Sequence, residues 1–337
     1  MSETVSFYTL TAENQEFGPR FHQVLERVLD SGRFVLGNEL QAFESELADY
    51  LGVPQVTCLK SGTDALYYGL KALGIGPGDE VLTSPFTFSA TVEAITRTGA
   101  TPVFADIEPI TLCLDPERCA EQLTARTRAI VLVHLFGNCG DLDRFVRLCR
   151  SNNLLLIEDA AQALGAEFQG RKLGSFGNAA IFSFYPTKNL GALGNGGALV
   201  LNRPLEVPNS ARLDELQAGF LRLKLPHLDD WNARRRELAE RYRLALHPWV
   251  RFATSHPDSL PNCHQFAILT PDRDRLRQFL SENGIQTMIY YPDPLYPLPV
   301  AARVASEILC LPVRHSLTFH EQGLIINKIQ EFFRTVS

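Results

Sequence analysis

Short apolar runs alternate with segments of helical spacing between residues 55 and 200, and this alternation restricts the possible fold more than any other feature of the sequence. Strands that alternate with helices build βαβ units, in which the strands lie parallel and the helices cover both faces of the sheet. We therefore expect an α/β protein with a mostly parallel central sheet flanked by helices.

The elements of this region can be placed from their apolar runs and from the turn residues between them. The predicted strands are residues 55–59, 80–83, 102–105, 129–134, 154–157, 180–184 and 197–201. The predicted helices are residues 63–73, 90–98, 116–123 and 141–150.

The pattern changes after residue 202, where a long charged segment favours a helix over residues 211–246. The elements predicted beyond it are a strand over 263–269, a helix over 272–283, a strand over 285–291 and a terminal helix over 319–335. A chain of 337 residues is long enough for two domains. We expect a large domain over residues 1–209, and a linking helix with a smaller C-terminal α+β domain over residues 210–337.

Composition excludes several classes of function. The formal net charge of −6 argues against a nucleic-acid-binding face, because such a face needs clustered Lys and Arg. The seven cysteines form no CxxC pair and have no zinc-ligand spacing, so we expect reduced thiols and no metal site. No apolar stretch is long enough to span a membrane, and the N-terminus lacks the pattern of a signal peptide. We expect a cytoplasmic protein.

Lys188 is the strongest candidate for a catalytic residue. It follows the apolar run 180–184 and precedes glycines at 191 and 194. A lysine that faces the interior usually has a covalent or ionic partner, because burying an unpaired ammonium is costly. Lys188 could hold the aldehyde of pyridoxal phosphate and, once released, move a proton. That second role needs a neutral amine, so we expect burial to lower the pKa of Lys188.

Two further features fit the same cofactor. Asp159 ends a predicted buried strand, where its carboxylate could pair with a protonated pyridine nitrogen. Ser61-Gly62-Thr63 lies at a predicted helix N-terminus, which favours a phosphate, and Ser183 could reach the same phosphate. Each feature has an ordinary alternative: Asp159 could form a buried ion pair, and Ser61 could simply cap the helix.

Other polar residues receive structural interpretations. His134 ends a predicted strand, where it could approach the cofactor or equally serve as a core histidine. His264 lies in the second part of the chain and is interpreted as structural. Asp229 and Asp230 are interpreted as the exposed face of a helix rather than as a catalytic carboxylate pair, because Trp231 supplies the buried side.

The motifs of the chain resemble those of the DegT/StrS-type sugar aminotransferases of fold type I, which use pyridoxal 5′-phosphate. The similarity extends from about residue 18 to residue 318. The matching segments are SGRFVLGNELQAFE (31–44), KSGTDAL (60–66), PGDEVLTSPFTFSATVEAI (77–95), EDAAQALGA (158–166), GSFGNAAIFSFYPTKNLGALGNGGALV (174–200) and SARLDELQAGFLRLKLPHLDDWNARRRELAERY (210–242).

The resemblance implies a cofactor role for seven residues of one chain. They are Lys188 as the Schiff-base lysine, Asp159 as the partner of the pyridine nitrogen, Gln162 near the ring hydroxyl, Gly62, Thr63 and Ser183 around the phosphate, and Phe88 stacked on the ring. Without the resemblance, Phe88 would be taken for an ordinary core residue. Family members are homodimers in which an asparagine of the partner chain completes each site, and Asn209 or the adjacent Ser210 matches that position.

The chain departs from the family pattern mainly around the sugar site. Residues 203–208 form a much shorter connection than the helix and loop of relatives, and residues 290–303 are also shortened. Asn195 stands where relatives commonly have an acidic residue. These departures affect the residues that would recognise the sugar and leave the cofactor residues in place.

The expected function is transfer of an amino group from L-glutamate to a keto group of a nucleotide-linked deoxysugar, at C3 rather than C4. The nucleotide and the sugar are left open. A sugar dehydratase is disfavoured because that branch lacks the lysine. Two other classes are weighed: a non-catalytic regulator of the same fold, and a nicotinamide-dependent oxidoreductase, which is disfavoured because residues 191–197 lack the GxGxxG order.

Overall fold

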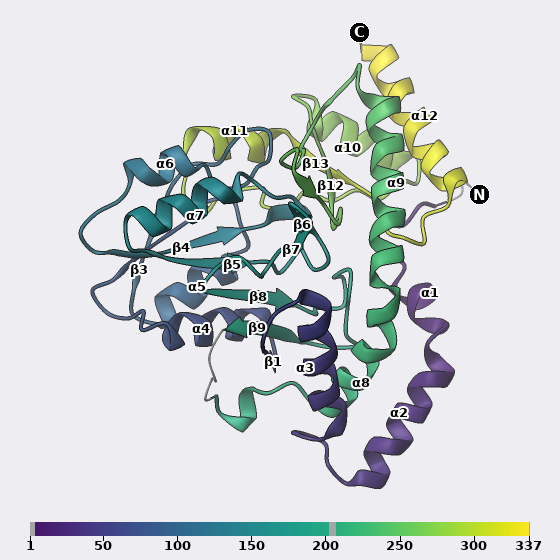
Figure 1. Cartoon of the computed structure of the whole chain (residues 1–337). Helices are drawn as coiled ribbons and strands as arrows, with labels where there is room; N and C mark the ends of the chain where they lie inside the picture. Colours follow the sequence, from purple (N-terminus) through teal and green to yellow (C-terminus); the bar gives the residue numbers. More distant parts are fainter. Residues whose placement is uncertain (1–3, 202–206, 337) are drawn as a thin grey trace.

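The central sheet has seven strands in the order β1-β9-β8-β5-β4-β2-β3 in the computed structural model, which describes residues 4–201 and 207–336 (Figure 1). The strands are β1 (Val56–Leu59), β2 (Glu80–Thr83), β3 (Thr101–Phe104), β4 (Thr127–Val133), β5 (Leu155–Asp159), β8 (Ala179–Ser183) and β9 (Gly197–Leu201). All seven coincide with predicted strands to within three residues at either end.

Most neighbouring strands of this sheet are parallel, as expected. The pairs β2–β3, β2–β4, β4–β5 and β5–β8 are parallel, whereas β9 runs antiparallel to both β8 and β1. The direction reverses because β8 returns into β9 through a loop rather than through a crossover helix. That loop carries Lys188, so the reversal places the lysine at the carboxyl end of β8.

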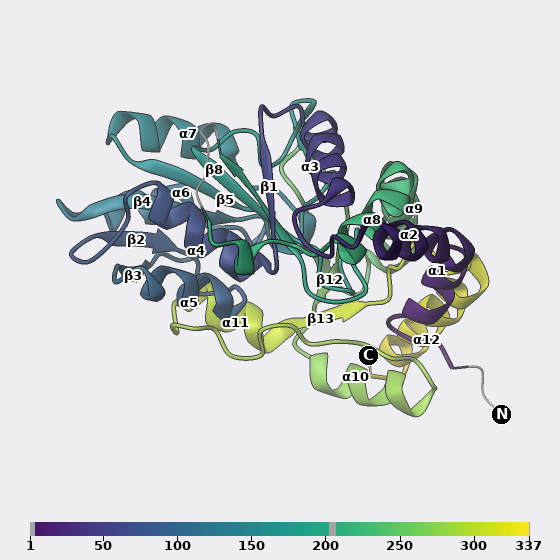
Figure 2. The same ribbon diagram turned by 90° about the horizontal axis from the view of Figure 1, so that it is seen from below.

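Helices cover both faces of the sheet (Figure 2). The helices of this part of the chain are α2 (Gly18–Ser31), α3 (Asn38–Leu51), α4 (Gly62–Ala72), α5 (Ser89–Arg97), α6 (Pro116–Glu121) and α7 (Leu142–Ser151). One core packs α3 and α7 against the sheet, and a second core packs α4 and α5 against its other face. The α/β class and the helices α4 to α7 are therefore confirmed.

A smaller region surrounds a third core, with a three-stranded antiparallel sheet in the order β10-β12-β13. Its elements are β10 (Arg251–Phe252), β12 (Phe266–Leu269), β13 (Ile308–Leu311), α9 (Leu228–Leu246), α10 (Arg273–Glu282), α11 (Pro299–Glu307) and α12 (Phe319–Val336). The short strands β6 (Glu167–Phe168), β7 (Arg171–Lys172) and β11 (Ser259–Leu260) form another small sheet.

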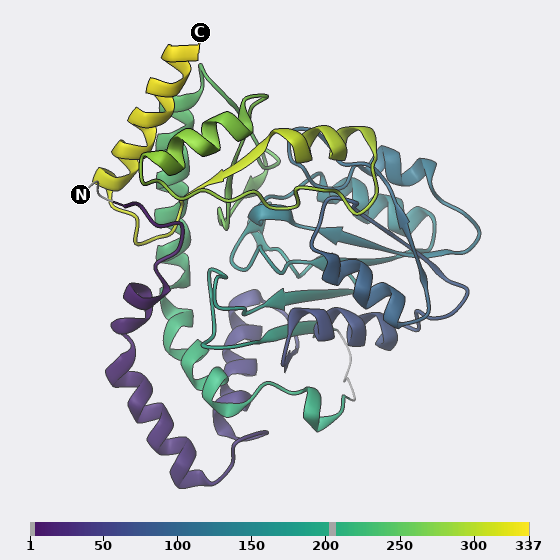
Figure 3. The ribbon, with the colours of Figure 1, turned by 180° about the vertical axis from the view of Figure 1, so that it is seen from behind.

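The N-terminal residues pack against this smaller region (Figure 3). Val5 is fully buried in its core and forms a parallel bridge with Ile285. The main-chain N–H of Val5 donates to Gly284 O at 2.9 Å, and the N–H of Gln286 donates to Val5 O at 3.0 Å. The short helix α1 (Leu10–Gln15) then leads the chain away towards α2. The smaller region thus combines both ends of the sequence.

The helix predicted over residues 211–246 is interrupted. The structure divides it into α8 (Glu215–Lys224), a 3-10 turn (Leu225–His227) and α9, and it places another 3-10 turn at Asn209–Ala211. Pro226 lies in the first of these turns and has no N–H for an α-helical hydrogen bond, which explains the interruption.

The strand predicted over residues 285–291 is wrong. Only Ile285 and Met288 form isolated bridges, with Val5 and Cys310. Tyr291 has φ +58°, a left-handed conformation that cannot continue a strand. The chain turns there and directs this segment to the large sheet instead.

The shortened connection over residues 203–208 lies outside the described residues, apart from Val207 and Pro208. Within the described ranges, no helix is both long and apolar enough to cross a membrane.

Candidate functional site

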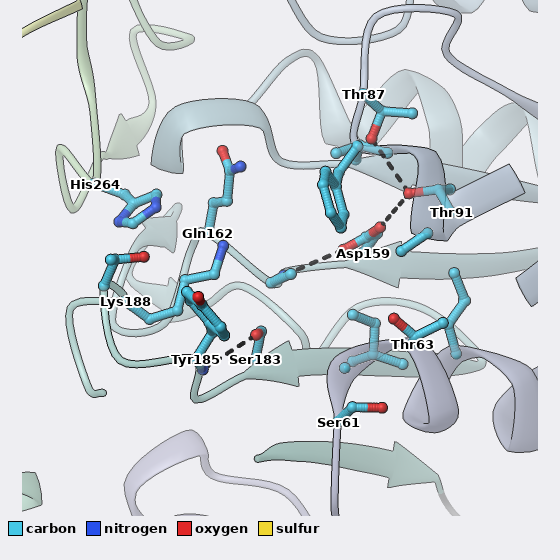
Figure 4. Close-up of a pocket in the computed structure, with 18 of the residues that line it drawn as sticks. Ser61, Thr63, Thr87, Thr91, Asp159, Gln162, Ser183, Tyr185, Lys188 and His264 are labelled. Carbon is cyan, nitrogen blue, oxygen red and sulfur yellow. Dashed lines mark hydrogen bonds between the residues drawn. The ribbon is translucent and has the colours of Figure 1, made fainter. Parts of the chain in front are cut away.

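A cavity of about 540 Å³ opens where the carboxyl ends of β5 and β8 meet the N-termini of α4 and α5 (Figure 4). The smaller region closes one side of it through His264, Tyr290 and Tyr291. Seven residues predicted to contact the cofactor line this cavity: Gly62, Thr63, Phe88, Asp159, Gln162, Ser183 and Lys188. The fold therefore brings together residues that are far apart in the sequence; Gly62 and Lys188 are separated by 126 positions.

Lys188 lies in the loop after β8, where its main-chain N–H donates to Tyr185 O at 2.8 Å. Its side chain extends into the cavity (Figure 4). Burial lowers the pKa of Lys188 to about 8, and the negative charge of Asp159 opposes that shift. About a tenth of this amine is therefore neutral at pH 7, far more than for a lysine of ordinary pKa, in the direction that the sequence prediction required.

Asp159 is the last residue of β5, and the residue is 6% exposed. The hydroxyl of Thr91 donates to Oδ2 at 2.9 Å, and the N–H of Ala161 donates to Oδ1 at 3.2 Å. Burial raises the pKa of Asp159, whereas both hydrogen bonds and the charge of Lys188 act in the opposite direction. A buried carboxylate held in this way fits a cationic ring nitrogen, because a buried negative charge is stabilised by a positive charge beside it.

The N-terminus of α4 approaches the end of β8 closely enough to form a narrow cradle. A Cβ on Gly62 would lie 3.2 Å from Ser183 Cβ, and a Cβ on Gly197 would lie 2.4 Å from Gly62 N. Ser61 caps the helix, since its hydroxyl accepts from Asp64 N at 3.0 Å. The capping interpretation of Ser61 is therefore confirmed. Gly62 and Thr63 line the cavity, where first-turn N–H groups favour an anion, and their role at a phosphate stays a prediction.

Phe88 is the N-cap residue of α5 and lines the cavity, although 62% of its side chain is exposed. It is therefore not the core residue that the pattern alone would indicate. A large aromatic ring left exposed at a cavity is suited to stacking on a bound ring.

Gln162 is held by hydrogen bonds at both ends of its amide. Oε1 accepts from the N–H of Phe136 at 2.6 Å, and Nε2 donates to the hydroxyl of Tyr291 at 2.9 Å. The rings of Phe136 and Tyr291 stack with a centroid separation of 6.2 Å, and both residues have positive φ. This arrangement couples the smaller region to the large sheet at the cavity and fixes the position of Gln162.

Several cavity residues were missed by sequence reasoning. Tyr8 comes from the segment before α1, and its hydroxyl is hydrogen-bonded to that of Tyr290. The side-chain amide of Gln265 donates to both hydroxyls, at 2.9 Å and 3.2 Å. No local pattern marks Tyr8, because its place depends on contacts with residues more than 250 positions away. The structural interpretation of His264 was incomplete, since its ring also lines the cavity.

His134 is a core residue, which was one of the two interpretations made from the sequence. Its Nε2 lies 3.0 Å from Oε2 of Glu158, and both side chains are fully buried. Glu158 also accepts from the N–H groups of Gly174, Phe176 and Gly177, so the pair fastens that loop to β5. Neither residue lines the cavity that contains Asp159.

Three other residues considered in the sequence analysis differ in their position relative to the cavity. Asp229 lies outside the cavity and accepts from the hydroxyl of Tyr50 at 2.6 Å, in agreement with a structural role. Asn195 lines the cavity. Asn209 is exposed in its 3-10 turn and does not line the cavity of its own chain, so its predicted role at a partner's site stays a prediction.

No group of three or more His, Cys, Asp or Glu side chains that could hold a metal ion occurs in residues 4–201 and 207–336. The cavity chemistry instead consists of one amine, one carboxylate, a helix N-terminus and an exposed aromatic ring.

Known proteins share both this sequence pattern and this architecture. The model of the DegT/DnrJ/EryC1/StrS aminotransferase family matches residues 15–207 and 205–330. A pleiotropic regulatory protein of Geobacillus stearothermophilus is 38% identical, covering 98% of this chain and 99% of the relative. The dTDP-3-amino-3,4,6-trideoxy-α-D-glucose transaminase of Streptomyces venezuelae is also 38% identical, covering 98% of this chain and 97% of the relative.

Solved structures agree with these sequence matches. The crystal structure of S. venezuelae DesV in complex with a ketimine intermediate matches with a TM-score of 0.94 and 38% identity, covering 98% of this chain and 99% of that chain. Solved structures among the matches also include one with the cofactor bound in its pyridoxamine phosphate form.

Proposed function

Because the chain belongs to the DegT/DnrJ/EryC1/StrS aminotransferase family, we propose that it moves an amino group from L-glutamate to the C3 keto group of a nucleotide-linked deoxysugar. The chain is an aminotransferase of fold type I, and its cofactor is pyridoxal 5′-phosphate. The observation that carries the proposal is the meeting of the Lys188 amine and the Asp159 carboxylate in one cavity beside the N-terminus of α4.

The bound cofactor supplies an electron sink that stabilises negative charge while a proton moves. Lys188 would hold it and, when free, carry the proton with its neutral amine. Asp159 would keep the ring nitrogen protonated, and the Thr91 hydroxyl and the Ala161 N–H would hold the carboxylate in place. Burial favours the neutral amine that Lys188 would need, whereas the carboxylate of Asp159 would be kept ionised, against the effect of burial, by its two hydrogen bonds and by the cationic ring nitrogen.

The remaining predicted residues would bind and orient the cofactor. We assign the phosphate to Gly62, Thr63 and Ser183, because a helix N-terminus and a hydroxyl meet there. Phe88 would stack on the ring, and Gln162 would lie near the ring hydroxyl with its orientation set by the hydrogen bonds to Phe136 N and Tyr291.

The substrate class is supported by the names of relatives. The S. venezuelae relative is named for a dTDP-linked 3-amino sugar, and relatives of Aneurinibacillus thermoaerophilus and Acidithiobacillus ferrooxidans are named for dTDP-linked and UDP-linked sugars aminated at C3. Amination at C3 is therefore preferred over C4. Glutamate is proposed as the donor from the resemblance alone.

We also propose that the chain acts as a homodimer in which Asn209 or Ser210 completes the site of the partner. Exposure of Phe88 and Tyr185 at the cavity supports this, because a partner would cover apolar surface there.

We also propose that the boundary between the large domain and the linking helix of the smaller domain falls after residue 209. Seven buried cysteines without disulfides support the proposed cytoplasmic location.

The two halves of the reaction can be tested separately by absorbance. Glutamate should convert the cofactor of the purified protein to its amino form, and a dTDP-linked or UDP-linked 3-keto sugar should restore the original spectrum. A Lys188→Ala variant should show neither change. An unchanged spectrum of the native protein with glutamate would instead support a non-catalytic regulator. Restoration by 4-keto sugars alone would move the reaction to C4.

A further inference from the structure

A buried amide network lies directly behind Lys188. The side chain of the next residue, Asn189, donates from Nδ2 to Asn232 Oδ1 at 2.7 Å and to the main-chain O of Asn262 at 3.2 Å. A main-chain carbonyl can only accept, so the nitrogen of the Asn189 amide must face Asn262. Asn232 donates in turn to Leu164 O at 3.2 Å, which fixes its orientation in the same way.

This orientation determines which nitrogen of His264 carries hydrogen. Oδ1 of Asn189 lies 3.0 Å from Nδ1 of His264, and an amide oxygen can only accept. Nδ1 must therefore be the protonated nitrogen. The main-chain N–H of His264 donates to Asn262 Oδ1 at 3.0 Å, so the residue is held on both sides by the network.

The ring of His264 is neutral. It is 5% exposed, and burial together with the positive charges of Lys188 and Arg235 holds its pKa well below the ordinary range. Since the single hydrogen of a neutral ring is on Nδ1, Nε2 carries a lone pair and no hydrogen. The ring borders the cavity on the side of Lys188 (Figure 4). Within the described residues, the hydrogen bond of the His264 ring is made by Nδ1.

A neutral hydrogen-bond acceptor such as Nε2 favours ligand groups that carry a hydrogen to donate over groups that can only accept. Carboxylate and phosphate oxygens of a ligand have no hydrogen to offer and would face the lone pair unfavourably. A sugar hydroxyl has a hydrogen to donate. Glutamate has one donor, the amino group that reacts, and this group is used at the cofactor. A fixed acceptor beside Lys188 is therefore suited to the sugar rather than to the amino donor.

We propose that His264 is a specificity-determining residue whose Nε2 accepts a hydrogen bond from a hydroxyl group of the sugar bound beside Lys188. The inference rests on the proposed function, because it concerns the sugar substrate of the same cavity. It assigns recognition to a residue of the smaller region, whose segment 290–303 is shortened relative to the family.

Two substitutions separate the two nitrogens of the ring. His264→Asn can still donate to Asn189 from its amide nitrogen, but it lacks an acceptor at the Nε2 position. His264→Gln can place its amide oxygen near the Nε2 position, but it loses the donor to Asn189. His22→Asn, on the exposed face of α2, is the control.

The main measurement is calorimetric binding of a dTDP-linked and a UDP-linked 3-amino sugar to each holoenzyme. For the sugar that the native protein binds, His264→Asn should raise the dissociation constant about tenfold, and His264→Gln less than about threefold. The rate of cofactor conversion by glutamate should stay within about twofold of the native rate in both variants.

Nitrogen-15 spectra of histidine-labelled protein provide a readout without turnover. The His264 signals, assigned by their loss in His264→Asn, should show a protonated Nδ1 and an unprotonated Nε2 from about pH 6 to pH 8.

Different failures have different meanings. Unchanged sugar binding in His264→Asn, or a protonated Nε2, would overturn the inference and leave the proposed function standing. An equal loss in the glutamate reaction would also overturn it, since His264 would then act through Lys188. If the native protein neither responds to glutamate nor binds either sugar, the proposed function fails and the inference fails with it.

Discussion

Lys188 and Asp159 share a cavity in which burial disfavours the charged form of both side chains. In the cofactor-free protein, the amine of Lys188 should titrate near pH 8 rather than at the ordinary lysine value of 10.5. The folded chain therefore loses this proton before the unfolded chain does. Lys188 should accordingly add to the free energy of unfolding as the pH rises from about 8 to 10.5.

The titration can be followed through the rate at which an amine-specific reagent modifies Lys188, read by peptide mass spectrometry. Its modification should be half-maximal near pH 8, and the exposed Lys60 and Lys71 are followed in the same samples as reference sites. Parallel profiles for all three lysines would contradict the assigned effect of burial.

Replacing Asp159 should slow catalysis far more than replacing Thr91, whose hydroxyl donates a hydrogen bond to it. Asp159→Asn removes the charge that would keep the ring nitrogen protonated, so the single-turnover rate with glutamate should fall about 100-fold or more. Thr91→Val removes only the hydroxyl that donates to Oδ2 and should cost about tenfold. A rate for Asp159→Asn within about threefold of the native rate would sink the proposed pairing.

Residue-level reasoning from sequence succeeded where a side chain follows a strongly patterned element. Asp159 and Ser183 end apolar strands, and the loop of Lys188 joins two of them, so their common place at one sheet edge was predictable. The contributions of Tyr8 and His264 were not predictable in this way. Tyr8 reaches the cavity through contacts made across the whole sequence, and the orientation of His264 depends on amides that come together only in the folded chain.

At the scale of elements, the start of β9 is packed against the start of α4. A Cβ on Gly197 would lie 2.4 Å from both Gly62 N and Ser61 C, and these main-chain atoms have no flexible side chain that could move aside. Gly197→Ala should therefore displace the helix N-terminus that we assign to the phosphate. We expect at least about tenfold weaker cofactor binding and a lower melting temperature.

Gly323→Ala is the matched control for this substitution. Gly323 lies inside α12, and a Cβ there would have no atom within 4 Å apart from its chain neighbours and the backbone of its own helix. The change should raise the free energy of unfolding by about 0.5–1 kcal/mol, because alanine loses less chain entropy in a helix. Thermal unfolding and cofactor titration of both variants provide the measurements. Equal effects of the two changes would show that packing at Gly197 is unimportant.

Prediction of elements from sequence failed where tertiary contacts override the local pattern. The alternating residues 285–291 resemble a strand, yet Tyr291 adopts a left-handed conformation and stacks on Phe136, which lies in the turn after β4. The break at Pro226 could have been predicted, because a proline inside a helical pattern removes an N–H and ends or kinks the helix. Most strands of the central sheet were found because their apolar runs are buried; the edge strand β3, which is only partly buried, is the exception.

At the scale of the whole molecule, the homodimer proposal makes a quantitative prediction. Lys188→Ala lacks the amine of its own site, and Asn209→Ala would lack a group needed in the site of its partner. A mixed dimer of the two variants would contain one intact site. After unfolding and refolding together, an equal mixture should recover about a quarter of native activity from two nearly inactive variants.

The complementation experiment also decides between cis and trans action. If Asn209 serves the cavity of its own chain, no mixed dimer has an intact site, and no activity returns. Ser210→Ala, mixed with Lys188→Ala in the same way, tests the neighbouring candidate. Light scattering on each sample verifies that dimers are present, so a monomeric native protein would contradict the proposal directly.

The pairing of Val5 with Ile285 has a consequence for the order of events during biosynthesis. A ribosome makes the beginning of the chain first, and the sheet of the large region can form as its strands emerge. The main chain of Val5, however, cannot form its hydrogen bonds until residues 284–286 have been made. Val5 is thus made before the strands of the large sheet but reaches its native place later, and until then the core of the smaller region that it helps to fill is accessible to chaperones.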